Sequence, residues 1–207
     1  MTERRYPVTT VDLLRHGRCQ GGDIFRGATD SPLTDEGWQQ MSAALARHSG
    51  WQRVISSPKL RCRAFAGSFA SEHKLPLQVV DDLREIDFGA WEGRTPGDIQ
   101  QDDSDLLQAY YRNPNTVTPP GGESLDSACV RFSGVWNQLL ARYRDEHLLM
   151  VAHGGTLRLL LANLLQAPMA SSRFFAVPPA SLIRLSVYHT PEGLFPQLIF
   201  HQPEPTL

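Results

Sequence analysis

The sequence contains no long hydrophobic run. Its longest apolar stretch, residues 159–165, includes an asparagine and is far shorter than the ~20 residues that a membrane span needs. The first residues, 1–7, lack the apolar centre of a signal peptide. From these absences we expect a cytoplasmic protein that does not bind a membrane.

Cysteines are few, and no histidine motif typical of a metal site is present. Cys19, Cys62 and Cys129 are odd in number and widely spaced, which excludes a disulfide framework and the usual zinc spacings. The sequence has no His-x-x-x-His or His-x-x-Glu-His pattern, and a zinc site needs such further ligands. We therefore expect no metal and no other cofactor.

Neither positive nor negative side chains are in large excess. Lysine and arginine number 20 against 22 aspartates and glutamates, a net charge of −2. This excludes the broad basic surface of non-specific nucleic-acid binding but leaves room for a local pocket that binds a small anion. The 207 residues are 41% hydrophobic and 20% charged, without internal repeats. We expect a soluble globular protein with one domain over residues 1–207.

Two short, mainly apolar runs each end in a histidine followed by glycine. Residues 10–14 precede Arg15-His16-Gly17, and residues 148–152 precede His153-Gly154-Gly155. Apolar runs of this length predict buried strands of a parallel sheet, and such sheets bind ligands beyond the carboxyl ends of their strands. One such end is explained equally well as a strand capped by surface polar residues. Two such strand ends, each with a histidine followed by glycine, favour a binding site.

Helical and strand patterns alternate along the rest of the chain, which predicts an α/β fold with a mostly parallel sheet. Helices are expected at 35–48, from 58 to about 73, at 124–145 and at 156–166, and strands at 53–56, 77–80, 148–152, 181–188 and 196–201. Thr34 and Ser57 are the expected N-caps of the first two helices. The third helix should contribute these residues to the core: Val130, Val135, Trp136, Leu139 and Leu140.

Residues 92–120 interrupt this alternation. They are rich in proline, glycine and aspartate, and only residues 105–111 are expected to form a helix. An excursion of this length inside a compact domain is typical of a lid or an insert that faces the substrate.

Two strand-end histidines among arginines favour covalent chemistry on a phosphate over metal binding. Arg15, Arg61 and Arg26 together would form a positive pocket, and arginine matches a phosphate through paired hydrogen bonds. The N–H groups of the helix that begins near Gly154 would point at the same anion. A histidine in such a pocket can act as a nucleophile. Arg61 alone is explained as well by a solvated helix face, but its position within one turn of Ser57 favours the site.

Transfer of a phosphoryl group from an alcohol also needs a proton for the leaving oxygen. Glu85 lies beside apolar residues, where burial favours the protonated form that an acid requires. An ion pair with Arg84 is its structural alternative, and Asp87 is the rival acid. Spacing alone leaves the choice open.

Six blocks, in order along nearly the whole chain, resemble the motifs of the histidine phosphatase superfamily, also called the phosphoglycerate mutase-like family. The blocks are residues 14–17, 29–37, 56–64, 83–93, 121–124 and 151–155. The resemblance implies a three-layer α/β/α sandwich and a metal-independent phosphomonoester hydrolase.

The resemblance also implies roles for particular residues. His16 is then the nucleophile that becomes phosphorylated, and Glu85, rather than Asp87, is the proton donor. Arg15, Arg61 and His153 would bind the phosphoryl group and stabilise its transition state. Gly154 and Arg26 complete the expected substrate-binding set.

Within the family, residues 20–27, 88–93 and 119–123 look like the branch of α-ribazole phosphatases, which act in the cobalamin pathway. This implies a small phosphorylated metabolite, α-ribazole 5′-phosphate, as substrate. A phosphoglycerate mutase or a broad phosphatase of small metabolites is the alternative within the family. A non-catalytic phosphate-binding protein is the alternative of another class.

The chain departs from the family pattern after the signature glycine. Arg18-Cys19 stand where Glu-Thr or Glu-Ser is common, which bears on substrate choice more than on the chemistry. We expect Cys19 to be a buried, inert thiol. The strands at 181–188 and 196–201 either close the sheet or pair with a second copy in a homodimer.

Overall fold

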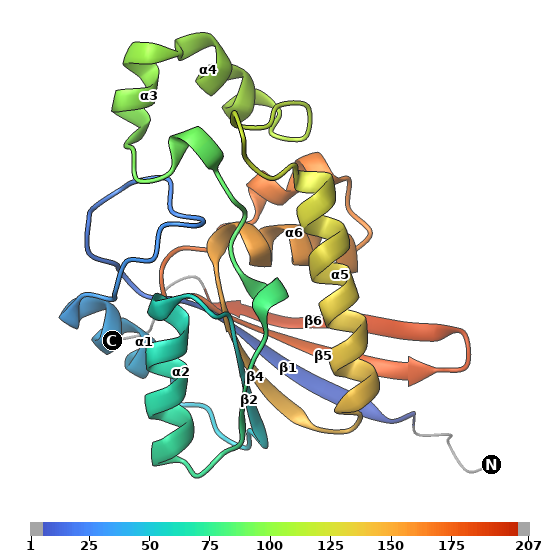
Figure 1. Ribbon diagram of the computed structural model, residues 1–207. Helices are drawn as coiled ribbons and strands as arrows, with labels where there is room; N and C mark the ends of the chain where they lie inside the picture. Colours follow the sequence, from blue (N-terminus) through green and yellow to red (C-terminus); the bar gives the residue numbers. More distant parts are fainter. Residues whose placement is uncertain (1–5, 203–207) are drawn as a thin grey trace.

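The computed structural model describes residues 6–202. A six-stranded sheet in the order β3-β2-β4-β1-β5-β6 forms its centre (Figure 1). The strands are β1 (Val8–Arg15), β2 (Arg53–Ser56), β3 (Leu77–Val79), β4 (His147–Ala152), β5 (Leu182–Thr190) and β6 (Gly193–Gln202). The first four are parallel, whereas β5 runs antiparallel to β1, and β6 to β5. The predicted mostly parallel sheet is confirmed.

The register of the sheet brings the two histidine motifs together. In the β1–β4 pair, Arg15 lies opposite Ala152, so His16 and His153 leave neighbouring strands at the same edge. Strand β2 lies on the other side of β4 with Ser56 opposite Val151, which brings Ser57 to the same place. The carboxyl ends of three parallel strands therefore meet where the sequence predicts a site.

Helices cover both faces of the sheet, as the three-layer sandwich requires (Figure 1). Helices α1 (Asp35–Leu45) and α2 (Leu60–Glu72) pack on one face, and α5 (Leu125–Arg142) and α6 (Gly154–Leu164) on the other. Each face has its own apolar core, one around Phe65 and Met41, the other around Trp136 and Leu160. Three short 3-10 helices connect these layers: η1 (Asp81–Leu83), η2 (Gly89–Trp91) and η3 (Met169–Phe174).

One predicted cap is confirmed and the other is wrong. The Thr34 hydroxyl accepts from the Gly37 amide and caps α1. Helix α2 begins at Leu60, later than expected, and its amide is bound by Asp30 Oδ1 at 2.7 Å. Ser57 is not the N-cap, which is Lys59; the Ser57 hydroxyl accepts from the Lys59 amide at 3.3 Å and lies 2.6 Å from His153 Nε2.

The expected burial of Val130 is also wrong, since this side chain is 74% exposed. The other four core candidates on α5 are buried, including Val135 and Trp136. Val130 lies five residues before Val135, about 140° around the helix, and so falls outside the apolar stripe.

Residues 92–120 contain two helices rather than one. Helix α3 (Pro96–Asp102) begins with a capping box between Thr95 and Asp98, and α4 (Ser104–Arg112) follows it directly. A small core formed by Trp91, Ile99 and Leu107 holds them together. Helix α3 has only 7 residues, about two turns, and carries too few apolar residues for its period to be recognised in the sequence.

The two edge strands of the sheet are β3 and β6, and β6 pairs with β5. Over residues 6–202, no helix is both long and apolar enough to cross a membrane.

Candidate active site

A pocket of about 210 Å³ opens at the carboxyl edge of the sheet. Five of the predicted site residues line it: Arg15, His16, Arg26, Glu85 and Gly154. The other two, Arg61 and His153, are fully buried beside His16 and do not line the pocket. The structure therefore brings all seven together, in two layers.

The His16 ring is positioned through one of its nitrogens. Nδ1 lies 2.8 Å from the carbonyl oxygen of Gly17, and a carbonyl only accepts, so Nδ1 carries the proton. The other nitrogen, Nε2, therefore keeps its lone pair. Burial, together with the charges of Arg15 and Arg61, holds the pKa of His16 well below its usual value. The imidazole is neutral at physiological pH and can act as a nucleophile.

Arg15 offers an unoccupied donor beside His16. Its Nη1 donates to the carbonyl of Val177 at 2.6 Å, whereas its Nε is buried without a partner. Burial, with the nearby charge of Arg158, lowers the pKa of Arg15 to about 10, so the guanidinium stays charged. A Cβ on Gly154 would lie 3.1 Å from the guanidinium, which explains the need for a small residue there.

His153 is held on both sides. Its Nδ1 accepts from Arg61 Nε at 3.2 Å, and its Nε2 lies 2.6 Å from Ser57 Oγ. The His16 and His153 rings meet edge to face, with centroids 5.3 Å apart. Burial and the charge of Arg61 hold the pKa of His153 well below its usual value, so both imidazoles are neutral.

Arg61 organises the loop that follows β1. Its Nη1 donates to the carbonyl of Thr29, and its Nη2 to those of Arg26 and Gly27. The same loop is held from its other side by the carboxylate of Glu92, which accepts from the amides of residues 27, 28 and 29. Burial alone would raise the pKa of Glu92, but these hydrogen bonds and that of the Thr29 hydroxyl lower it.

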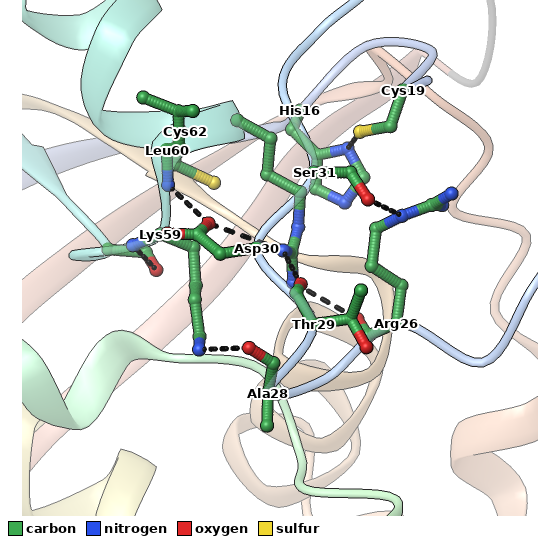
Figure 2. A network of polar contacts seen from close by, with 12 residues as sticks. His16, Cys19, Arg26, Ala28, Thr29, Asp30, Ser31, Lys59, Leu60 and Cys62 are labelled. Carbon is green, nitrogen blue, oxygen red and sulfur yellow. Dashed lines mark hydrogen bonds and ion pairs between the residues drawn. The ribbon is translucent and has the colours of Figure 1, made fainter. Parts of the chain in front are cut away.

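Figure 2 shows further anchors of this loop, where Lys59 reaches the carbonyl of Ala28 and Asp30 binds the amide of Leu60. The loop is thereby fixed against the start of α2. The Arg26 guanidinium lies against Ser31 in the same view, with 3.1 Å between Nε and Oγ. Arg26 lines the pocket while holding the carbonyls of residues 20 and 22.

Glu85 is buried, as expected, but its carboxylate is not surrounded by apolar groups alone. It accepts from the amides of Ile86, Gly155 and Thr156 and from the Thr156 hydroxyl, at 2.9 to 3.1 Å. Two of these amides belong to the first turn of α6, a favourable place for an anion. The donors offset the cost of burying the carboxylate. The rival Asp87 instead accepts from the Gly89 amide in a turn and does not line the pocket.

The two residues that depart from the family pattern have different surroundings. Arg18 is exposed and pairs with Glu36 at 2.9 Å, outside the pocket lining. Cys19 is buried, as expected, with its sulfur 3.5 Å from His16 Nδ1 (Figure 2). Burial raises the pKa of this thiol, so it stays protonated and unreactive.

The sequence did not predict several residues of the site, including four polar ones. Ser57 holds His153, Glu92 holds the loop, and Arg158 and Tyr110 line the pocket. Arg158 lies one turn after Gly154 on α6, so helical spacing from the His-Gly-Gly motif was a usable signal. Tyr110 reaches the site from α4, and nothing in its local sequence indicates this contact.

No group of three or more His, Cys, Asp and Glu within residues 6–202 is arranged to hold a metal ion.

The model of the histidine phosphatase superfamily (branch 1) matches residues 11–194. A bifunctional protein of Mycobacterium tuberculosis is 35% identical over 171 residues, which cover 80% of this chain and 47% of that protein. An adenosylcobalamin/alpha-ribazole phosphatase of Salmonella typhimurium is 31% identical over 169 residues, covering 80% of this chain and 84% of that one.

A solved structure, mycobacterial hydrolase 2, superposes with a TM-score of 0.87 at 26% identity, over 97% of this chain and 93% of its own. The chain belongs to the histidine phosphatase superfamily, branch 1. It spans about half the length of the mycobacterial relatives that it matches.

Proposed function

We propose that this chain hydrolyses phosphomonoesters through a phosphohistidine formed on His16. The observation that carries the proposal is the pairing of a neutral His16, whose Nε2 lone pair is not needed to position the ring, with the unpartnered Nε of Arg15 in one pocket. A nucleophile and an anion-binding donor are thus side by side.

The proposed reaction has two steps. His16 Nε2 attacks phosphorus, the bond from phosphorus to the alcohol oxygen breaks, and a protonated Glu85 gives its proton to that oxygen. Water then attacks the phosphohistidine, the P–N bond breaks, and the Glu85 carboxylate takes the proton of the water. The amide groups around Glu85 fix the carboxyl beside the reacting group in both steps.

Arg15, Arg61 and His153 are the proposed stabilisers of the transferring group. Arg15 lines the pocket and would contact the group through its guanidinium. Arg61 and His153 already bond to protein atoms, so contact with a phosphate oxygen requires them to exchange one of these partners. At its present position, Arg61 acts through its charge and through the loop that it holds.

We propose α-ribazole 5′-phosphate as the substrate and a reaction that needs no metal ion. The 31% identity to an adenosylcobalamin/alpha-ribazole phosphatase supports this choice. Within the proposal, residues 92–120 form the substrate-facing insert, since Tyr110 within it and Phe88 just before it line the pocket.

The test is phosphate release from α-ribazole 5′-phosphate, 3-phosphoglycerate and a generic aryl phosphate, in the presence of a chelator. We expect release by the wild type and a loss of about 10⁴-fold or more in His16→Ala. His73→Ala, which removes an exposed histidine just after α2, is the matched control and should behave as the wild type. Survival of full activity in His16→Ala would refute the phosphohistidine. Interconversion of phosphoglycerates without net hydrolysis would instead identify a mutase, and binding without turnover a non-catalytic protein.

A further inference from the structure

A second cavity of about 280 Å³ adjoins the catalytic pocket between α4, α6 and η3. The two cavities share the lining residues Ile86, Tyr110, Gly155 and Arg158. A phosphate at His16 therefore has its ester oxygen directed either to solvent or toward this second space. Because the two cavities adjoin at these residues, one ligand could extend from the first into the second.

The walls of the second cavity are mainly apolar and aromatic. Tyr110 and Tyr111 supply one wall, with ring centroids 6.1 Å apart, and Leu125 and Leu159 another. Tyr111 is 55% exposed, so an aromatic surface stands open at this place. Flat apolar surfaces of this kind favour a planar ring as ligand, through stacking and edge contacts.

Tyr110 has a polar group that no protein atom satisfies. Its ring is fixed by edge contacts with Trp91 and Phe25, at 5.2 and 6.2 Å between centroids. Its hydroxyl has no hydrogen bond to any of residues 6–202, although Tyr110 is partly buried and lines both cavities. The hydroxyl is therefore free to bond a ligand at the junction, where the two cavities meet.

Arg158 stands at the same junction with most of its donors unused. Its Nε donates to the carbonyl of Phe175 at 3.1 Å, and within residues 6–202 this is the side chain's only hydrogen bond. A guanidinium held by one edge presents its plane and its remaining N–H groups to a ligand. Arginine planes stack on aromatic rings as well as binding anions.

We propose that this second cavity binds the alcohol half of the substrate, and that this half carries a planar aromatic ring and a hydroxyl group. Tyr110 binds the hydroxyl at the junction, and the ring lies against Tyr111 and the plane of Arg158. The inference rests on the proposed phosphatase reaction in the adjoining pocket and names the class of ester that the chain selects.

A carboxylate-bearing alcohol is the competing occupant, because Arg158 and Arg173 both line the cavity. The structure favours the ring. Arg173 already donates to the carbonyl of Arg112 and lies over the Phe174 ring, and the remaining walls offer no further cation.

The test compares α-ribazole 5′-phosphate with glycerol 2-phosphate, which lacks a ring, and with 3-phosphoglycerate, which carries a carboxylate. The readout is the ratio of kcat/KM for the ring-bearing ester to that for each small ester. We expect Tyr110→Phe to lower the ratio about three- to tenfold, since it removes one hydrogen bond. Arg158→Met should lower it about tenfold, chiefly through KM, with partial rescue in Arg158→Lys. Arg63→Met, an exposed arginine of α2, is the charge-matched control and should leave the ratio unchanged.

A second measurement does not depend on turnover. Calorimetry should detect binding of α-ribazole, the alcohol without phosphate, to His16→Ala, and this binding should weaken in His16→Ala combined with Tyr110→Phe. Unchanged ratios in both single variants would overturn the inference while leaving the phosphatase reaction intact. Selective loss of 3-phosphoglycerate turnover in Arg158→Met would show that the cavity binds a carboxylate instead. Absence of phosphate release from every ester would count against the proposed function, and the calorimetry would then decide the inference alone.

Discussion

The two nitrogens of the His16 ring have different surroundings, and this asymmetry prepares one of them for chemistry. The carbonyl of Gly17 fixes the proton on Nδ1, and burial among arginines keeps the ring neutral. The nucleophilicity proposed for His16 is therefore set by the backbone turn after β1 and by the charges of Arg15 on β1 and Arg61 on α2, not by the histidine alone.

The glycine after Gly154 makes room for the proposed proton donor. A Cβ on Gly155 would lie 2.7 Å from Glu85 Oε1 and 2.9 Å from Ile86 Cδ1. We expect Gly155→Ala to displace the Glu85 side chain and to lower phosphate release at least tenfold, while the helical position keeps the fold stable. Gly134→Ala on α5, where nothing lies within 4 Å of the added atom, is the control and should be neutral or stabilising by about 0.5–1 kcal/mol. Full activity in Gly155→Ala would show that the Glu85 position is not critical.

On helix α5, the position of a valine around the helix axis, and not its apolar character, decides whether it is buried. Val135 is 5% exposed and packs under the sheet, whereas Val130 is 74% exposed. We expect Val135→Ala to lower the free energy of unfolding by about 1–3 kcal/mol, and Val130→Ala to change it by less than about 0.5 kcal/mol. Denaturant titration of both variants measures the difference. Equal losses would mean that Val130 is covered in solution.

Helices α3 and α4 depend on their own small core. Leu107 is 2% exposed and packs with Trp91 and Ile99. We expect Leu107→Ala to destabilise this part by about 2–4 kcal/mol and to speed hydrogen exchange over residues 96–112 more than in the β-sheet. Because Tyr110 lies on α4, KM for the proposed substrate should rise as well. Uniformly faster exchange across the whole chain would show that these helices unfold only with the rest.

The sheet contains a buried charged group that ties together three distant parts of the chain. Asp12 is fully buried in β1 and accepts from Arg184, His147 and Trp51 at 2.7 to 3.0 Å. Burial alone would raise the pKa of Asp12, but the hydrogen bonds from Arg184 and His147 lower it. The carboxylate is therefore retained in the folded protein because all its partners are present together.

The lowered pKa values of Asp12 and Glu92 predict acid sensitivity. A group whose pKa is lower in the folded state stabilises the fold above its unfolded pKa, near 4, and loses this contribution as the pH falls through the folded value. We expect the free energy of unfolding to fall on acidification below about pH 4. Asp12→Asn should cost about 2–4 kcal/mol at pH 7 by leaving Arg184 without its anion, and the penalty should shrink toward pH 3. Unfolding curves at both pH values measure this, and a pH-independent penalty would contradict it.

Sequence alone predicted the α/β class, the mostly parallel sheet and the two strand-end histidines, because these depend on local apolar runs and on glycines at their ends. It also predicted which side chains gather at the carboxyl edge, since parallel strands must end together. The N-cap Thr34 was also predictable from the sequence, because a capping side chain bonds to an amide only three residues further along the chain.

Only the tertiary structure decided which partner each side chain takes. Ser57 has the residue type of a helix cap, yet it binds His153, which arrives from a strand 96 positions further along the chain. Glu85 was expected among apolar groups, and the first turn of α6 surrounds it with amides. Tyr110 lies at the pocket because α4 folds back over it. Such choices depend on which atoms meet when distant elements pack, and the free energy of a buried hydrogen bond is gained only where both partners are brought into contact.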